Sequence, residues 1–120
     1  MARFGSTITV VADGEAFHGF GWRFKRLIRA ARRSAAELIC HLDAYDTICL
    51  EPLDRALEKY QTRGEPILMS FEPSPQPEYW LSLNPGMMIA RREALLDVFT
   101  DSILEAVFPE IGRASCRERV

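Results

Sequence analysis

The segment Leu38-Ile-Cys-His-Leu42-Asp43-Ala-Tyr-Asp46 joins a short apolar run to two carboxylates three residues apart. The apolar run ends abruptly at Asp43, as a buried β-strand does where the chain leaves a sheet. Helical patterns lie on both sides of this strand. Apolar residues recur at spacings of three and four over residues 22–35, and a second helix is expected over residues 51–63, between a proline in its first turn and Gly64. A strand between two helices indicates an α/β fold.

Further strands are predicted at residues 7–12, 66–71 and 86–90, and a closing amphipathic helix at residues 91–107. Residues 72–78 contain three prolines and should form a loop. Alternating strands and helices favour a mostly parallel sheet flanked by helices. Because ligands bind outside the carboxyl ends of such strands, we expect a site just after Leu42, just after Phe71 and around Asn84.

Composition narrows the class of protein. The chain has 120 residues, of which 48% are hydrophobic and 27% charged, as in a globular domain. A net charge of −2 argues against a nucleic-acid partner. No apolar run approaches the roughly 18–20 residues of a membrane helix, and no signal peptide is recognisable. The three cysteines form no CxxC pair. A cytoplasmic, reducing location is therefore predicted.

The acidic pair Asp43 and Asp46 suggests a metal site. Hard cations such as Mn²⁺ and Mg²⁺ prefer oxygen ligands and keep positions open for substrate phosphates. Two carboxylates just after the carboxyl end of a strand can hold such a cation while the cation bridges a diphosphate. Capping or a solvated turn is the simpler interpretation, since aspartate is common in both. A phosphatase that uses two aspartates needs a gap of one residue between them, whereas the gap here is two.

The motif Asp43-Ala-Tyr-Asp46 after a hydrophobic strand resembles the Asp-x-x-Asp signature of GT-A fold glycosyltransferases. The resemblance is to the domain shared by procollagen galactosyl- and glucosyltransferases and lysyl hydroxylases. Three more segments agree with that family in order and approximate spacing: Gly19–Lys25, Ser70–Pro73 and Tyr79–Ile89. Pro85 and Met87 depart from the family pattern, which has serine and glycine at these places.

The resemblance implies a partial GT-A (Rossmann-like) sandwich from an enzyme that moves a hexose from a UDP-sugar to a hydroxyl acceptor on a protein or glycan. It implies Mn²⁺ or Mg²⁺ as cofactor, held by Asp43 and Asp46, with Asp46 the direct ligand. Lys25, Asn84 and Gly86 would join Asp43 in binding the nucleotide-sugar, and Glu72 would lie near the donor or acceptor. The alternative is a non-catalytic α/β domain in which the acidic pair is only a structural turn.

The terminal segment Ile111–Val120 has no hydrophobic period and resembles a translated sequencing adapter. We therefore predict a glycosyltransferase-like domain over residues 1–110 and an artefactual tail over residues 111–120. The family has one more strand before residues 7–12 and further acidic and histidine ligands after Glu110. We thus expect a fragment, truncated at both ends, that is inactive on its own.

Overall fold

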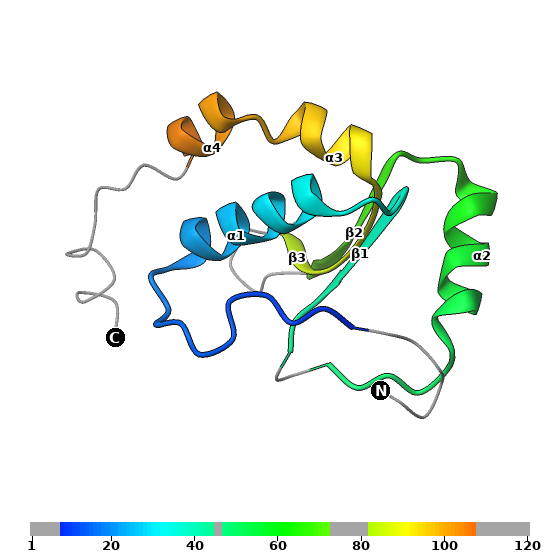
Figure 1. The fold of residues 1–120 in the computed structure, drawn as a ribbon. Coiled ribbons are helices and arrows are strands. Elements are labelled where there is room, and N and C mark those ends of the chain that lie inside the picture. The colour runs from blue at the N-terminus through cyan, green and yellow to red at the C-terminus, as the bar shows by residue number, and fades with distance from the viewer. Residues whose placement is uncertain (1–7, 45–46, 73–81, 108–120) are drawn as a thin grey trace. The chain divides into compact units, whose positions relative to one another are not determined.

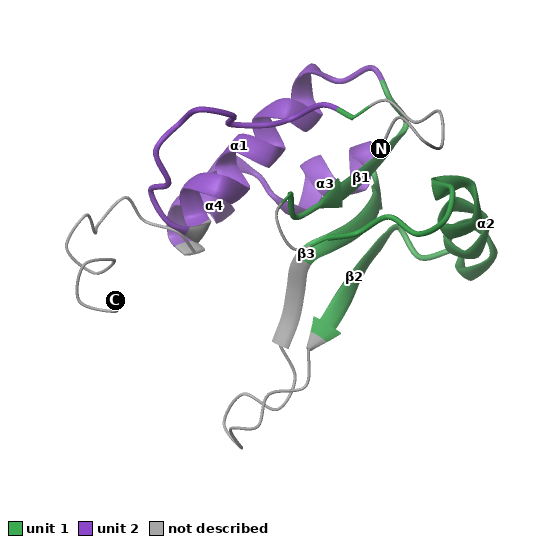
Figure 2. Cartoon of the chain, turned by 90° about the horizontal axis from the view of Figure 1, so that it is seen from below, with its two compact units in different colours: residues 1–8, 36–91 green, residues 9–35, 92–120 purple. Residues whose placement is uncertain are grey.

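The structure is a computed structural model that describes residues 8–44, 47–72 and 82–107 (Figure 1). Its elements mix helices and strands, which confirms the α/β class. The chain forms two compact units, residues 1–8 with 36–91 and residues 9–35 with 92–120 (Figure 2). The elements in chain order are α1 (Phe20–Arg33), β1 (Leu38–Leu42), α2 (Leu53–Arg63), β2 (Ile67–Glu72), β3 (Ser82–Arg91), α3 (Arg92–Val98) and α4 (Asp101–Val107).

The sheet of the first unit has the strand order β1-β3-β2, and β3 is antiparallel to both neighbours. The described pairings thus differ from the mostly parallel sheet expected from the sequence. The short connection between β2 and β3 gives the reason for the antiparallel pairing. Only residues 73–81 separate β2 from β3, whereas a crossover between adjacent parallel strands takes about a dozen residues or more. Because β1 and β2 both oppose β3, they run parallel to each other, and their carboxyl ends lie at the same edge of the sheet.

The two faces of this sheet differ in burial. Met88 and Ala90 of β3 are 1% and 0% exposed, as side chains that alternate onto one covered face should be. Met87 and Ile89 alternate onto the other face, where Met87 is 50% exposed and the cross-strand partner of Ile89, Cys40, is also exposed. One face therefore contributes core, and the opposite face is only half covered.

Helix α2 ends with a defined cap and an anchor to the next strand. Gly64, the residue after Arg63, adopts the left-handed conformation at φ 74°, which glycine adopts without steric cost. Tyr60 is 4% exposed, and its hydroxyl donates a hydrogen bond to the carbonyl oxygen of Pro66 at 2.9 Å. This bond fixes the last turn of α2 to the segment that enters β2.

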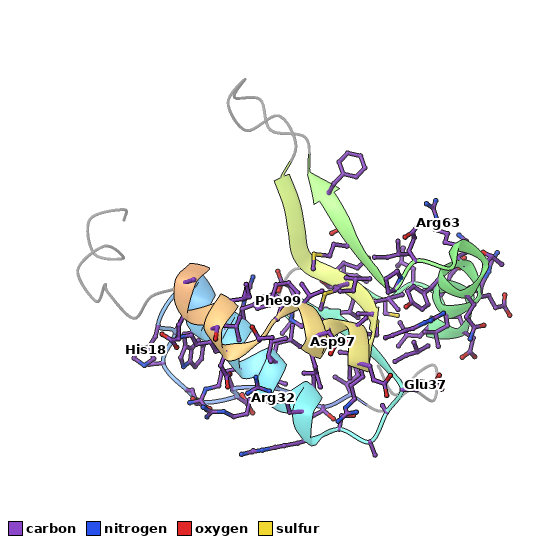
Figure 3. The ribbon with its side chains drawn as sticks, turned by 90° about the horizontal axis from the view of Figure 1, so that it is seen from above. His18, Arg32, Glu37, Arg63, Asp97 and Phe99 are labelled. Atoms are coloured by element: carbon purple, nitrogen blue, oxygen red, sulfur yellow. The ribbon has the colours of Figure 1, made fainter. Side chains whose placement is uncertain are left out.

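The second unit has its own helical core. Helix α1 packs against α3 and α4. Phe99 lies between these two helices (Figure 3), and its ring meets the ring of Phe24 in α1 edge to face, with the ring centroids 4.6 Å apart. Arg92 at the start of α3 donates from Nε to the carbonyl oxygen of Ala31 at 3.0 Å, which adds a second donor to a carbonyl in the last turn of α1 that the Ser34 amide also bonds, at 3.2 Å. The buried apolar side chains of this unit are Leu27, Ile28, Ala31, Leu95 and Leu104.

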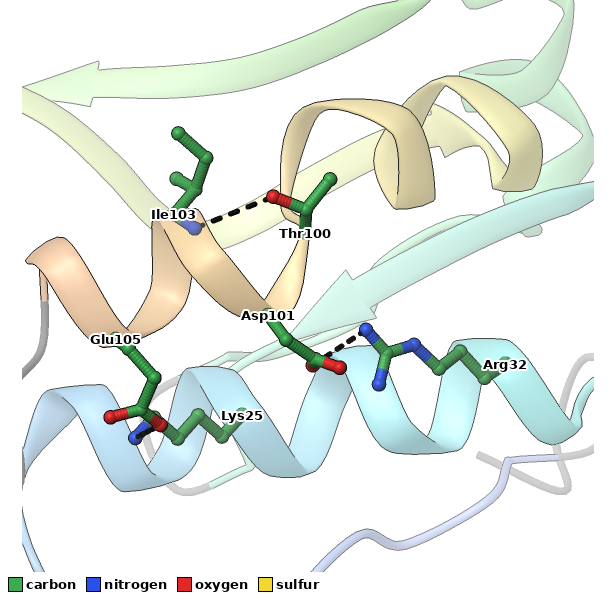
Figure 4. Close-up of polar contacts among 6 residues, drawn as sticks. All are labelled: Lys25, Arg32, Thr100, Asp101, Ile103 and Glu105. Atoms are coloured by element: carbon green, nitrogen blue, oxygen red, sulfur yellow. Dashed lines mark hydrogen bonds and ion pairs between the residues drawn. The ribbon is translucent and has the colours of Figure 1, made fainter.

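Two sequence predictions differ from the structure in this unit. The predicted strand at residues 7–12 is irregular over its described part, and Val10 is 64% exposed, so the segment lacks the strand neighbours that would bury its apolar side chains. The helix predicted over residues 91–107 is divided into α3 and α4. Thr100 marks the break, because its hydroxyl oxygen accepts a hydrogen bond from the amide of Ile103 at 3.4 Å and so caps α4 (Figure 4).

The remaining predicted helices and strands agree with the structure, whereas the loop predicted at residues 72–78 begins with the last residue of β2 and otherwise lies outside the described residues. The helices expected at residues 22–35 and 51–63 correspond to α1 and α2, and the strands expected at residues 38–42, 66–71 and 86–90 correspond to β1, β2 and the second half of β3. Among the helices of the described ranges, none has the length and apolar character that a membrane crossing requires.

Adjacent residues in α4 test the core of the second unit. Leu104 is 4% exposed and Ile103 is 45% exposed, and changing either isomeric side chain to alanine removes the same number of carbons. Leu104→Ala should lower the free energy of unfolding by about 2–4 kcal/mol, because it removes buried apolar contacts and leaves a cavity. Ile103→Ala should cost less than half as much. Urea denaturation measures both, and equal losses would contradict the assignment of Leu104 to the core.

The left-handed cap of α2 gives a second prediction. A Cβ added at Gly64 meets nothing within 4 Å, so substitution there tests backbone conformation alone. Gly64→Ala should destabilise the protein by about 1 kcal/mol, and Gly64→Asn by less, because asparagine tolerates the left-handed region better than alanine. Thermal unfolding of the two variants beside the unchanged protein gives the order. A Gly64→Ala protein as stable as the unchanged one would show that the cap contributes nothing.

Candidate functional site

The carboxyl end of β1 brings Asp43 against β3. The Asp43 amide donates a hydrogen bond to the carbonyl oxygen of Gly86 at 2.8 Å. Leu42 pairs with Met87 one step earlier, so this bond extends the β1–β3 ladder by one rung. Asp43 is half-buried and Gly86 is buried. The first aspartate of the acidic pair is therefore fixed beside a predicted sugar-binding glycine, while Asp46 lies outside the described residues.

A bulge interrupts β3 at the same place. On β2, Met69 and Ser70 are consecutive, but their partners on β3 are Met88 and Asn84. Residues 85–87 therefore have no partner on β2. Pro85 gives the reason, because proline lacks the amide hydrogen that a central strand must donate to its neighbour. Bulges of this kind occur next to active sites, where they change the direction of the chain and of its side chains.

The end of β2 completes the edge. Ser70 pairs with Asn84, and Glu72 pairs with Ser82. Because β1 and β2 are parallel, Glu72 and Asp43 end their strands at the same edge, with β3 between them. Two strand spacings separate β1 from β2, or about 10 Å, and the partners of Asp43 and Glu72 on β3, Gly86 and Ser82, add a stagger of four positions along that strand. The topology thus gathers Asp43, Glu72, Asn84 and Gly86 at one edge, but it places the backbones of Asp43 and Glu72 too far apart for neighbouring ligands of one metal.

Lys25 belongs to the other unit. Its ammonium forms an ion pair with Glu105 at 2.6 Å, so the partner that the structure gives this predicted nucleotide-binding residue is a carboxylate (Figure 4). About two turns further along α1, Arg32 forms an ion pair with Asp101 of α4, with 2.8 Å between Nη2 of the arginine and Oδ1 of the aspartate. The acidic partners are 61% and 79% exposed. Exposed pairs of this kind contribute about 0–1 kcal/mol each, so they align α1 with α4 without holding either side chain tightly.

The basic side chains of α1 have further partners at its amino-terminal end. Arg26 pairs with Glu15 at 2.5 Å, and its guanidinium lies 5.7 Å from the ring centre of Trp22. His18 and Phe17 meet the same indole edge to face, with ring centres 5.6 and 6.1 Å from it. This cluster holds the segment before α1 against its first turns, and Glu15 offsets the charge of Arg26.

Within residues 8–44, 47–72 and 82–107, no group of three or more histidine, cysteine, aspartate or glutamate side chains is placed to hold a metal ion. Asp43 is the described member of the predicted ligand pair, and its carboxylate is an oxygen donor of the kind that hard cations prefer.

The site also contains a feature that the sequence patterns did not reveal. The sequence predicts a strand over residues 86–90, yet residues 85–87 form the bulge described above. The Pro85-Gly86 dipeptide was the available signal, because proline inside a central strand requires an irregular pairing. The departure of Pro85 from the family pattern therefore coincides with a change in backbone geometry.

Cys40 and Cys49, to which no catalytic role was assigned, are free thiols on the same unit. Although Cys40 as a whole residue is exposed, partial desolvation of its thiol, and to a smaller extent the charge of Cys49, raise the pKa of that thiol. The Cys49 sulfur itself donates a hydrogen bond to the carbonyl oxygen of Glu51 at 3.1 Å. A raised pKa lowers the fraction of thiolate, which is the reactive form. The environment of Cys40 therefore disfavours a nucleophilic role.

Comparison with known proteins adds no assignment: no family model matches the chain, and no curated protein or solved structure matches it.

The raised pKa of Cys40 predicts slow alkylation. At pH 8.5, Cys40 should react with iodoacetamide several-fold more slowly in the folded protein than in urea, because the folded protein holds less thiolate. Cys49→Ser should restore part of the rate, since it removes the smaller of the two causes. Peptide mass spectrometry of the alkylated protein measures both rates. Equal rates for Cys40 in the folded and unfolded chains would contradict the raised pKa.

The same shift fixes the sign of a pH effect on stability. Well below a pH of about 8.5, Cys40 is protonated in both the folded and the unfolded chain and contributes no pH dependence. Above that pH, the unfolded chain loses this proton first because the folded pKa is higher. The contribution of Cys40 to the free energy of unfolding should therefore fall as the pH rises. Cys40→Ser should flatten the decline measured by urea denaturation between pH 8 and 10.

Proposed function

We propose that this chain carries the donor-binding part of a metal-dependent glycosyltransferase that moves a hexose from a UDP-sugar to a hydroxyl acceptor. The observation that carries the proposal is the hydrogen bond from the Asp43 amide to the carbonyl oxygen of Gly86. It joins two residues that are 43 positions apart in the sequence and that the family resemblance assigned to one site. The β1–β3 register brings these two backbones together, which supports the proposal.

Sheet topology supports the proposal further. The strands β1 and β2 run parallel with their carboxyl ends at one edge, which is where α/β proteins bind ligands. In the proposed GT-A-like sandwich, these two strands belong to the parallel part of the sheet and β3 is an antiparallel member between them. Asn84 and Glu72 reach the same edge through their pairing with Ser70 and Ser82.

The donor set fits a hard divalent cation. Asp43 supplies a half-buried carboxylate at the sheet edge, and Asp46 supplies a second carboxylate three residues later. Mn²⁺ and Mg²⁺ commonly bind through one or two carboxylates and complete their coordination with water and substrate phosphates. When bound, the metal offsets the charge that develops on the departing UDP.

The chain's own residues then have distinct tasks. The ladder bond to Gly86 holds the Asp43 backbone in place, so the Asp43 carboxylate extends from a fixed point of the chain. Gly86 has no side chain, which allows the sugar to approach the backbone closely. The asparagine amide at position 84 can donate to one sugar hydroxyl and accept from another. Glu72 is proposed to act beside the donor or acceptor, apart from the metal ligands.

A role for Lys25 in binding a phosphate of the nucleotide stays a prediction from the sequence. The Lys25 ammonium pairs with Glu105, whose side chain is 61% exposed. The protein or glycan nature of the acceptor and the cytoplasmic location stay predictions from the sequence.

Calorimetry of UDP binding in the presence of Mn²⁺ tests the proposal. The unchanged chain should bind UDP weakly, and an Asp43→Asn, Asp46→Asn double variant should bind at least tenfold more weakly, because the amides cannot supply the anionic ligands that Mn²⁺ requires. Omitting Mn²⁺ should have the same effect as the double substitution.

A matched control removes a carboxylate elsewhere in the same unit. Asp54 is an exposed residue in the first turn of α2, and Asp54→Asn should leave UDP binding unchanged. If the double variant binds UDP as the unchanged chain does, the acidic pair is not a metal–diphosphate site. Absence of binding by a folded, unchanged chain would favour the non-catalytic α/β domain with the pair as a structural turn.

A further inference from the structure

We draw no further inference here: the strongest candidate, the half-exposed apolar face of the β1–β3–β2 sheet on which Cys40, Met87 and Ile89 lie, carries none because nothing in the structure shows what covers it.

Discussion

The central position of β3 is the constraint on which the candidate site depends. With only residues 73–81 between them, β2 and β3 pair as antiparallel neighbours, and β1 then pairs with the free edge of β3. Because β1 and β2 are each antiparallel to β3, they are parallel to each other. Asp43, directly after β1, and the carboxyl end of β2 therefore lie at the same edge of the sheet. The site is thus a consequence of strand order, and a parallel β3 would have placed Asn84 and Gly86 differently.

The bulge in β3 separates a part of the strand that pairs with both neighbours from a part where pairing with β2 is interrupted. Over its second half, β3 pairs with both neighbours and contributes the buried side chains Met88 and Ala90 to the core. Near Pro85 it cannot continue this double ladder, because proline has no amide hydrogen to donate. Its pairing with β2 is interrupted there, while Gly86 still accepts a hydrogen bond from Asp43. The irregularity lies at the predicted ligand-binding edge, where regular pairing would occupy the backbone groups of both strands.

The two units rely on different interactions. In the first, backbone ladders between strands fix the register of the residues at the sheet edge. In the second, apolar side chains such as Ile28 and Leu95 are buried among packed helices, and exposed ion pairs add alignment. The backbone of Asp43 is held by a ladder bond to Gly86, whereas Lys25 is held by a pair with an exposed carboxylate. The proposed function therefore depends mainly on the first unit.

Local patterns in the sequence determined most of the elements. The apolar periodicity of α1, the glycine after Arg63 and the apolar runs at Leu38 and Ile67 each act within a few residues, so they could be identified without the fold. Strand direction, the bulge at Pro85 and the meeting of Asp43 with Gly86 were decided only by the tertiary structure, because each depends on pairing between segments distant in the sequence. The exposed segment at Val10 shows the same limit. A β-type sequence forms a strand only where another strand supplies its hydrogen-bond partners.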